Sequence, residues 1–241
     1  MMNSINPLRS GNTAENKPIF PVRHFVPRFE QNEVVVCGTI ESDAVVYEPR
    51  FGCEVLSLVL LVPRLSGVLD RVPVCISFQL ASLCNLSLHA GENLMVSGQI
   101  RTHFDETGHM RTEVFASVAS HTSTVASNHN MVRLTGEIAN QPVYNVTPFG
   151  REITSTILRV PYSDNGYRGV AQIPVIFWGK LAKTIESYRV DEAISIFGRF
   201  QSRDYEKRLE NDVVEKKTTF EISTHHFTPI ERNFINNRGI F

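Results

Sequence analysis

Short apolar runs separated by turn residues recur along the chain. In the C-terminal half, five such runs are rich in Val, Ile, Thr and Phe, which are the residue types that favour strands. Turn sequences such as TPFG and SDNG lie between them. The five predicted strands cover residues 132–138, 152–161, 170–178, 193–203 and 217–227.

One segment between the third and fourth of these strands has the periodicity of a helix. In KLAKTIESYR (180–189), Leu181, Ile185 and Tyr188 recur at the spacing of one helix face. The N-terminal half has the same order of elements, with a less regular helix candidate, ASLCNLSLH (81–89). Its predicted strands are 34–40, 54–63, 72–78, 93–100 and 110–119.

An internal repeat relates the two halves. The sequences CGTI, FGCE and LVPR match TGEI, FGRE and RVPY, each 98 residues later, and SGQI matches FGRF 100 residues later. Four ordered matches, with a two-residue insertion before the last, indicate two copies of one domain. The predicted organisation is a polar arm (1–30), a first domain (31–120), a linker (121–130), a second domain (131–228) and a short tail (229–241).

Each copy has the element order of an OB-fold. An OB-fold is a five-stranded Greek-key barrel whose second and third strands, with nearby loops, bind oligonucleotides or oligosaccharides. Five strands with one short helix between the third and fourth, in about 100 residues, fit this barrel. The predicted fold class is therefore all-β, with two tandem OB-folds.

Composition is that of an ordinary globular protein, with 42% hydrophobic and 20% charged residues among 241. The longest aliphatic run, VLSLVLLV (55–62), has the length of a strand and is far short of a membrane-spanning helix. The N-terminal segment has no apolar export signal, so the expected location is the cytoplasm.

Charge is distributed unevenly along the chain. Residues 1–127 carry 9 basic and 12 acidic residues (net −3), and the remainder carries 15 basic and 13 acidic residues (net +2). The second half is therefore the better candidate to contact a polyanion.

The sequence carries no pattern typical of a metal site, a cofactor site or an enzyme. The four cysteines occur singly in apolar surroundings, which predicts buried reduced thiols rather than a zinc site or disulfides. His225 and His226 are adjacent, and adjacent strand residues point to opposite faces. Lys180 follows a glycine but lacks the rest of a phosphate-binding loop, and there is no GxSxG or HExxH motif. The cysteines are Cys37, Cys53, Cys75 and Cys84.

The second half resembles the bacterial single-stranded DNA-binding proteins. The motifs VRLTGEIANQP, FGRE, FWGKLAK and GRFQSRDYE, followed by KKTTFEIS, occur in that family's order across about 131–227. The resemblance implies a non-catalytic protein that coats single-stranded DNA in replication, recombination and repair, normally with four OB-folds per assembly. A chain with two OB-folds would then form a homodimer.

Binding to single strands without reading sequence requires aromatic faces for base stacking and cations along the backbone. Trp178, the only tryptophan, stands where the family has a base-stacking aromatic, and Tyr205 stands at a second such place. Arg199 and Arg203 are four residues apart on a predicted strand, so they share a face and are the preferred phosphate contacts. The remaining candidates are Lys180, Lys207, Arg208, Tyr167 and Arg168, and in the first half Phe78 and Phe104.

Several of these residues have a second interpretation. Trp178 follows Ile176 and Phe177 and would also suit a buried core position. The charged run 204–217 is expected to be a long hairpin tip, and an ordinary solvated, salt-bridged hairpin fits its sequence as well as a DNA contact does. Either Ser77 or Phe78 is the counterpart of Trp178 in the first half. Since the first half has fewer cations, we expect weaker DNA binding there, with a mainly architectural role or that of a degenerate duplicate as the two alternatives.

A second function also remains open at this stage, that of an OB-fold adaptor for protein partners in a replication or primosome-like assembly. Family members usually end in an acidic tip that recruits other replication proteins. Glu231 is the only acidic residue after position 227, so recruitment through such a tip is not expected.

Overall fold

The computed structural model describes residues 31–125, 129–164, 166–208 and 214–230. The predicted polar arm (1–30), the middle of the predicted linker (126–128) and most of the predicted tail (231–241) lie outside these ranges. Within them, neither helix is long and apolar enough to cross a membrane. The same residues contain no group of three His, Cys, Asp or Glu side chains placed to hold a metal ion.

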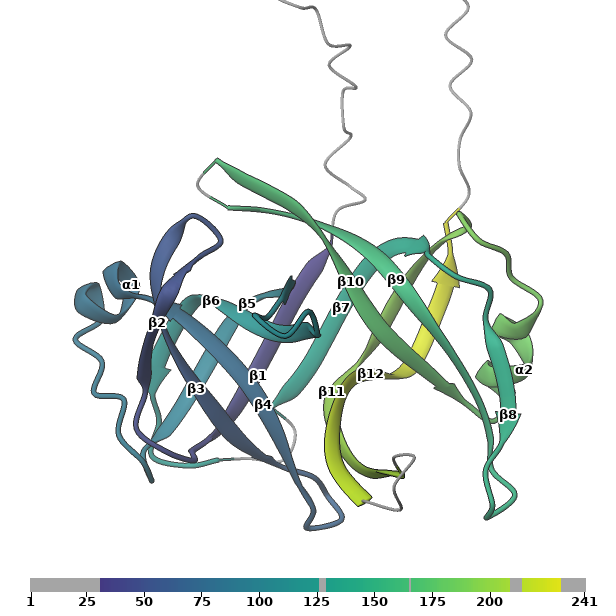
Figure 1. Cartoon of the computed structure of the whole chain (residues 1–241), viewed down its shortest axis with the longest axis horizontal. Helices are drawn as coiled ribbons and strands as arrows, with labels where there is room; N and C mark the ends of the chain where they lie inside the picture. Colours follow the sequence, from purple (N-terminus) through teal and green to yellow (C-terminus); the bar gives the residue numbers. More distant parts are fainter. Residues whose placement is uncertain (1–30, 126–128, 165, 209–213, 231–241) are drawn as a thin grey trace, which may run out of the picture.

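Two β-barrels lie side by side along the long axis of the molecule (Figure 1). The first contains β1 Asn32–Ile40, β2 Val45–Arg50, β3 Cys53–Pro63, β4 Leu69–Ser77, β5 Asn93–Phe104 and β6 Met110–His121, with helix α1 Phe78–Leu83. The second contains β7 Asn130–Ile138, β8 Val143–Val146, β9 Glu152–Asp164, β10 Tyr167–Trp178, β11 Ala193–Arg208 and β12 Val214–Pro229, with helix α2 Lys180–Glu186.

Both barrels close in the same way. The first has the strand order β3-β4-β6-β5-β1 and closes through β1–β3, and the second has β9-β10-β12-β11-β7 and closes through β7–β9. Only the β4–β6 and β10–β12 pairs are parallel among the described strands. Five closed strands with one helix between β4 and β5, or between β10 and β11, confirm the predicted tandem OB-folds.

The repeated glycines of the fourth barrel strands are required by close backbone packing. A β-bulge places an extra residue, Ser117 in β6 and His225 in β12, opposite the steps from Ser97 to Gly98 in β5 and from Phe197 to Gly198 in β11. A Cβ atom on Gly198 would lie 2.3 Å from the carbonyl oxygen of Ser223 in β12. The bulges bend these strands around a core of apolar side chains that is continuous through both barrels.

The barrels join through an antiparallel pairing of their first strands, β1 and β7. Val34 lies opposite Val132, which is its counterpart 98 residues later in the repeat. The pairing therefore relates the two copies by an approximate two-fold axis. Two asparagines make equivalent hydrogen bonds on either side of this axis. Asn32 bonds to the backbone of Ile100 in β5, and Asn130 bonds to the backbone of Phe200 in β11.

Two predicted elements differ in extent from the structure. Helix α1 covers Phe78–Leu83 rather than 81–89, because the Ser77 hydroxyl accepts a hydrogen bond from the Leu80 N–H and starts the helix earlier. Asn85, with a positive φ of 47°, ends it. The edge strands β2 and β8 were not predicted, since each is short.

Two predicted loops are partly strand. β9 continues to Asp164 and β10 begins at Tyr167, so the first half of the predicted SDNG turn (163–166) belongs to a long hairpin. β11 continues to Arg208 and β12 begins at Val214, which shortens the predicted 204–217 tip, and residues 209–213 lie outside the described chain. In both places cross-strand pairing extends regular structure into polar sequence.

The prediction of four buried thiols is wrong for two cysteines. Cys37 and Cys75 are buried, but Cys53 is only half-buried and Cys84 is exposed. Cys84 caps the C-terminal end of α1 at the surface, where its apolar neighbours in sequence do not cover it.

Candidate nucleic-acid interface

Trp178 is the last residue of β10 and points outward from the barrel. It pairs with Ile153 of β9, and the preceding Phe177 is fully buried, so the alternation of the strand turns Trp178 toward solvent, where it is 36% exposed. Gly179 then adopts a positive φ of 55°, which favours glycine, and its N–H donates to the Glu152 carbonyl at 3.0 Å. This turn fixes Trp178 at the end of the strand. Because the side chain faces solvent there, Trp178 is not the core residue that its apolar neighbours in sequence would also have suited.

An open pocket of about 480 Å³ lies beside the indole of Trp178. The tip of the β8–β9 hairpin forms the opposite wall. Within that tip, the Gly150 N–H donates to the Thr147 carbonyl at 2.8 Å, and the Arg151 N–H donates to Thr147 Oγ1 at 3.0 Å. The pocket is lined by Val146, Gly150, Arg151, Glu152, Trp178 and Gly179.

The charges around this pocket favour an anionic ligand. Glu152 is the one carboxylate in the lining, and Lys183 Nζ lies 2.7 Å from its Oε1 while the Tyr144 hydroxyl donates to it at 3.0 Å. These contacts, with Lys183 first, lower the pKa of Glu152 and keep it ionised but paired. Arg151 and Lys180 are exposed and form no ion pair among the described residues. An aromatic face and two available cations therefore meet at one place.

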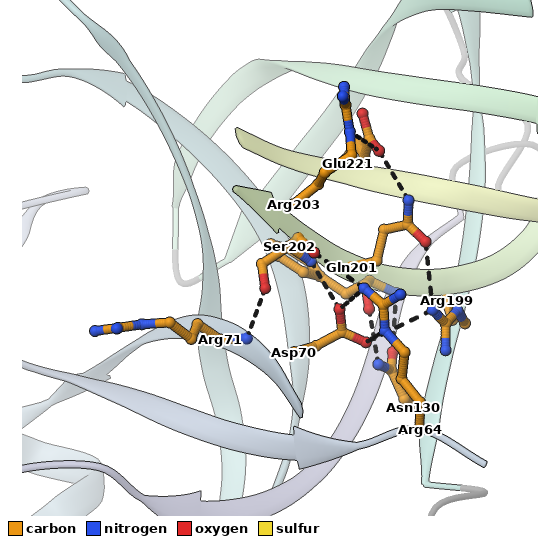
Figure 2. Close-up of polar contacts among 10 residues, drawn as sticks. Arg64, Asp70, Arg71, Asn130, Arg199, Gln201, Ser202, Arg203 and Glu221 are labelled. Carbon is orange, nitrogen blue, oxygen red and sulfur yellow. Dashed lines mark hydrogen bonds and ion pairs between the residues drawn. The ribbon is translucent and has the colours of Figure 1, made fainter. Parts of the chain in front are cut away.

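Arg199 and Arg203 lie on one face of β11, as predicted, but their surroundings differ (Figure 2). The Arg199 guanidinium contacts Gln201 at 3.3 Å and lies 3.7 Å from the buried Asp70 of the first barrel. Burial lowers the pKa of Arg199, and the charge of Asp70 opposes that shift. Arg203 Nε lies 3.5 Å from Glu221, and its side chain stays 59% exposed. Arg203 is thus the more exposed of the pair, since the Arg199 side chain is only 22% exposed.

The β9–β10 hairpin of the second barrel packs on the first barrel rather than standing free. Tyr162 is buried, and it stacks on Tyr167 at 6.2 Å between ring centroids. Arg101 of the first barrel is 1% exposed, lies 3.7 Å from the Phe115 ring centroid and donates to Asp164 at 3.2 Å. Tyr167 and Arg168, at the start of β10, retain exposed surface.

The first barrel has no aromatic at the position of Trp178. Val55 pairs with Ser77, whereas its counterpart Ile153 pairs with Trp178, so Ser77 is the true equivalent. Phe78 is partly exposed at the start of α1. Phe104 is exposed at the end of β5, and in the 100-residue register of the repeat it corresponds to Asp204 rather than Tyr205.

Three predicted site residues lie on the extended end of β11. Tyr205 pairs with Lys217 of β12, Lys207 with Glu215 and Arg208 with Val214. The structure thus places their backbone on the hairpin that projects from the second barrel near the junction of the two barrels (Figure 1).

Sequence reasoning missed two exposed residues of the β8–β9 turn. Arg151 lines the pocket and Phe149, at the tip, is 92% exposed. The available signal was an aromatic and a cation inside a turn sequence, TPFGR, where a buried role is uncommon.

Comparison with known proteins connects this site to a family. The model of the single-strand binding protein family matches residues 129–230. A single-stranded DNA-binding protein of Clostridium tetani is 33% identical over 100 residues, which are 38% of this chain and 69% of the relative. A single-stranded DNA-binding protein 2 of Streptococcus agalactiae serotype V is 34% identical over 83 residues, 33% of this chain and 63% of the relative.

The likeness in fold extends over both barrels. The crystal structure of a deletion mutant of the single-stranded DNA binding protein from Thermus aquaticus superposes with a TM-score of 0.62, at 18% identity, covering 86% of this chain and 97% of that one. The sequence match rests on the second barrel, and the structural match includes the first. These matches show that the chain belongs to the single-strand binding protein family.

Proposed function

We propose that this protein binds single-stranded DNA without catalysis and without strong sequence preference, through its second barrel. The observation that carries the proposal is the exposed Trp178, fixed at the end of β10 beside an open pocket with Arg151 and Lys180. Bases stack on the indole, and the two cations contact phosphates. Arg203, Tyr167 and Arg168 are the further predicted contacts that keep exposed surface.

The first barrel has a mainly architectural role in this proposal. By the registers of the repeat, Ser77 replaces Trp178, Gln79 replaces Lys180 and Cys53 replaces Arg151. The Ser77 hydroxyl is also occupied as the cap of α1. This barrel therefore lacks both the stacking face and the cations that support binding in the second.

Two chains associate in this proposal as a homodimer with four OB-folds, the number that the family resemblance implies, and serve replication, recombination and repair. Sedimentation equilibrium over a range of protein concentrations tests the assembly. A mass of one chain at all concentrations would contradict it.

The test of DNA binding is titration with an oligo-dT labelled for anisotropy, at low and at high salt, with the emission of Trp178 recorded in parallel. We expect quenching, and an affinity that falls as salt rises because phosphate contacts release counterions. Trp178→Ala should weaken binding about 5- to 100-fold, since one stacked base contributes roughly 1–3 kcal/mol. The matched control, Phe78→Ala in the first barrel, should change affinity less than about twofold. Absence of any anisotropy change would instead favour an adaptor for protein partners.

A further inference from the structure

We propose that Phe149 is a second base-stacking platform, adjacent to Trp178, so that single-stranded DNA continues over the tip of the β8–β9 hairpin. This inference rests on the proposed function and adds a contact that neither the repeat nor the family resemblance assigns. The ligand is a nucleobase neighbouring the one on Trp178, with the intervening phosphate near Arg151.

The turn that carries Phe149 is well defined. The Thr147 N–H donates to the Arg151 carbonyl at 2.8 Å, and the Arg151 N–H donates to the Thr147 hydroxyl at 3.0 Å. Gly150 takes a positive φ of 73°, which glycine adopts without cost. The phenyl ring is thus held 92% exposed on a structured turn rather than at a chain end.

The repeat shows that this exposure is not imposed by the local sequence. Phe51 is the counterpart of Phe149, in FGCE against FGRE, yet it is only 9% exposed. Its ring packs against Phe115 and Tyr162 at centroid distances of 5.7 and 6.3 Å. The first barrel therefore uses this aromatic for packing, whereas the second presents it to solvent, where an uncovered phenyl ring contributes nothing to folding.

The position of Phe149 fits a strand of DNA that passes through the pocket beside Trp178. Gly150 and Arg151, which follow Phe149 directly, line that pocket together with the indole. Phe149 directly precedes these two lining residues in the turn, and Arg151 follows it by two residues. Alternating aromatic and cationic groups are what a sequence-tolerant single-strand site requires.

A fluorescence reporter tests the contact directly. Phe149→Trp in a Trp178→Phe background leaves one tryptophan in the chain, at the turn, while a phenyl ring remains at position 178. We expect oligo-dT to quench this reporter as labelled DNA gains anisotropy. Unchanged emission during demonstrated binding would overturn the inference and leave the proposed function intact. If the parent protein bound no DNA, the proposed function itself would fail.

Affinity provides the second measurement. Phe149→Ala should weaken binding on the order of tenfold for long oligo-dT, and the difference should vanish for oligonucleotides too short to reach both aromatics. Phe149→Tyr should bind like the parent. Leu83→Ala removes an exposed apolar side chain from α1, at the far end of the molecule, and serves as the control (Figure 1). An equal effect of Leu83→Ala, or a loss of self-association rather than of DNA affinity in Phe149→Ala, would also overturn the inference.

Discussion

The carboxylate of Asp70 in the first barrel faces the guanidinium of Arg199 in the second, with 3.7 Å between Asp70 Oδ2 and Arg199 Nη2. Asp70 is fully buried and also accepts hydrogen bonds from Arg64 Nε at 2.9 Å and from the Ser202 N–H at 2.9 Å. The contacts of Asp70 with Arg199 and Ser202 cross the junction between the barrels, whereas Arg64 belongs to the first barrel (Figure 2). An arginine that suits phosphate binding by its position on the strand is thus engaged in holding the two barrels together.

Removing the buried carboxylate should destabilise the protein substantially. Asp70→Ala leaves the guanidinium groups of Arg64 and Arg199 without their shared partner, so we expect the free energy of unfolding in urea to fall by about 2–4 kcal/mol. Glu41→Ala breaks the more exposed ion pair with Arg71 and should cost less than about 1 kcal/mol. Equal losses in the two variants would show that the Asp70 cluster does not stabilise the junction.

The aromatic environment of Arg101 leads to a second stability prediction. Arg101→Ala removes a buried cation from between aromatic rings of both barrels and leaves Asp164 without this partner. We expect a loss of about 2–4 kcal/mol in the free energy of unfolding, and faster hydrogen exchange along the β9–β10 hairpin. Arg111→Ala, which breaks an exposed pair with Asp105, is the matched control and should cost under about 1 kcal/mol. Unchanged exchange in the hairpin would contradict the proposed packing role.

The fold could be predicted because its determinants are local. Each determinant acts over a few residues, as the strand-forming runs, the turn residues and the repeated glycines do. The constant 98-residue offset between matching motifs indicated the duplication. All ten predicted barrel strands are present, and the unpredicted β2 and β8 lie at the sheet edges, where little apolar burial is needed.

The contacts between barrels could not be predicted in this way. Asp70 and Ser202 are separated by 132 residues, and nothing near either position indicates the other. Phe51 and Phe149 share the local pattern F-G-x-E but differ in exposure, because the rest of the molecule covers only Phe51. Burial of Tyr162 and the pairing of Arg199 depend on the same long-range docking, so sequence patterns identified the candidate residues but not their environments.

Stability should depend on pH through His225. Contact with the Phe197 ring removes part of its hydration, and the charge of Arg199 repels a second cation, so the pKa of His225 is lowered from 6.5. The unfolded chain then takes up this proton at a higher pH than the folded chain does. The contribution of the neutral imidazole to the free energy of unfolding is fully present above pH 6.5, and it is lost as the pH falls through the pKa of the folded state. Thermal unfolding between about pH 7.5 and pH 5.5 should show Tm falling with acid, less steeply in His225→Gln. Parallel profiles for the parent and the variant would exclude this group.

The salt dependence of DNA affinity should distinguish cationic side chains that contact DNA from those that hold the barrels together. Each phosphate contact to a single strand contributes about 0.7 to the slope of log affinity against log salt. Arg151→Gln and Lys180→Gln should each reduce the slope by about this amount and leave the urea midpoint unchanged, because both side chains are exposed and form no ion pair among the described residues. Arg199→Gln should instead lower the urea midpoint with little change in slope, since its charge faces Asp70. The opposite result, a slope change for Arg199→Gln at unchanged stability, would assign Arg199 to the DNA and the junction to its remaining contacts.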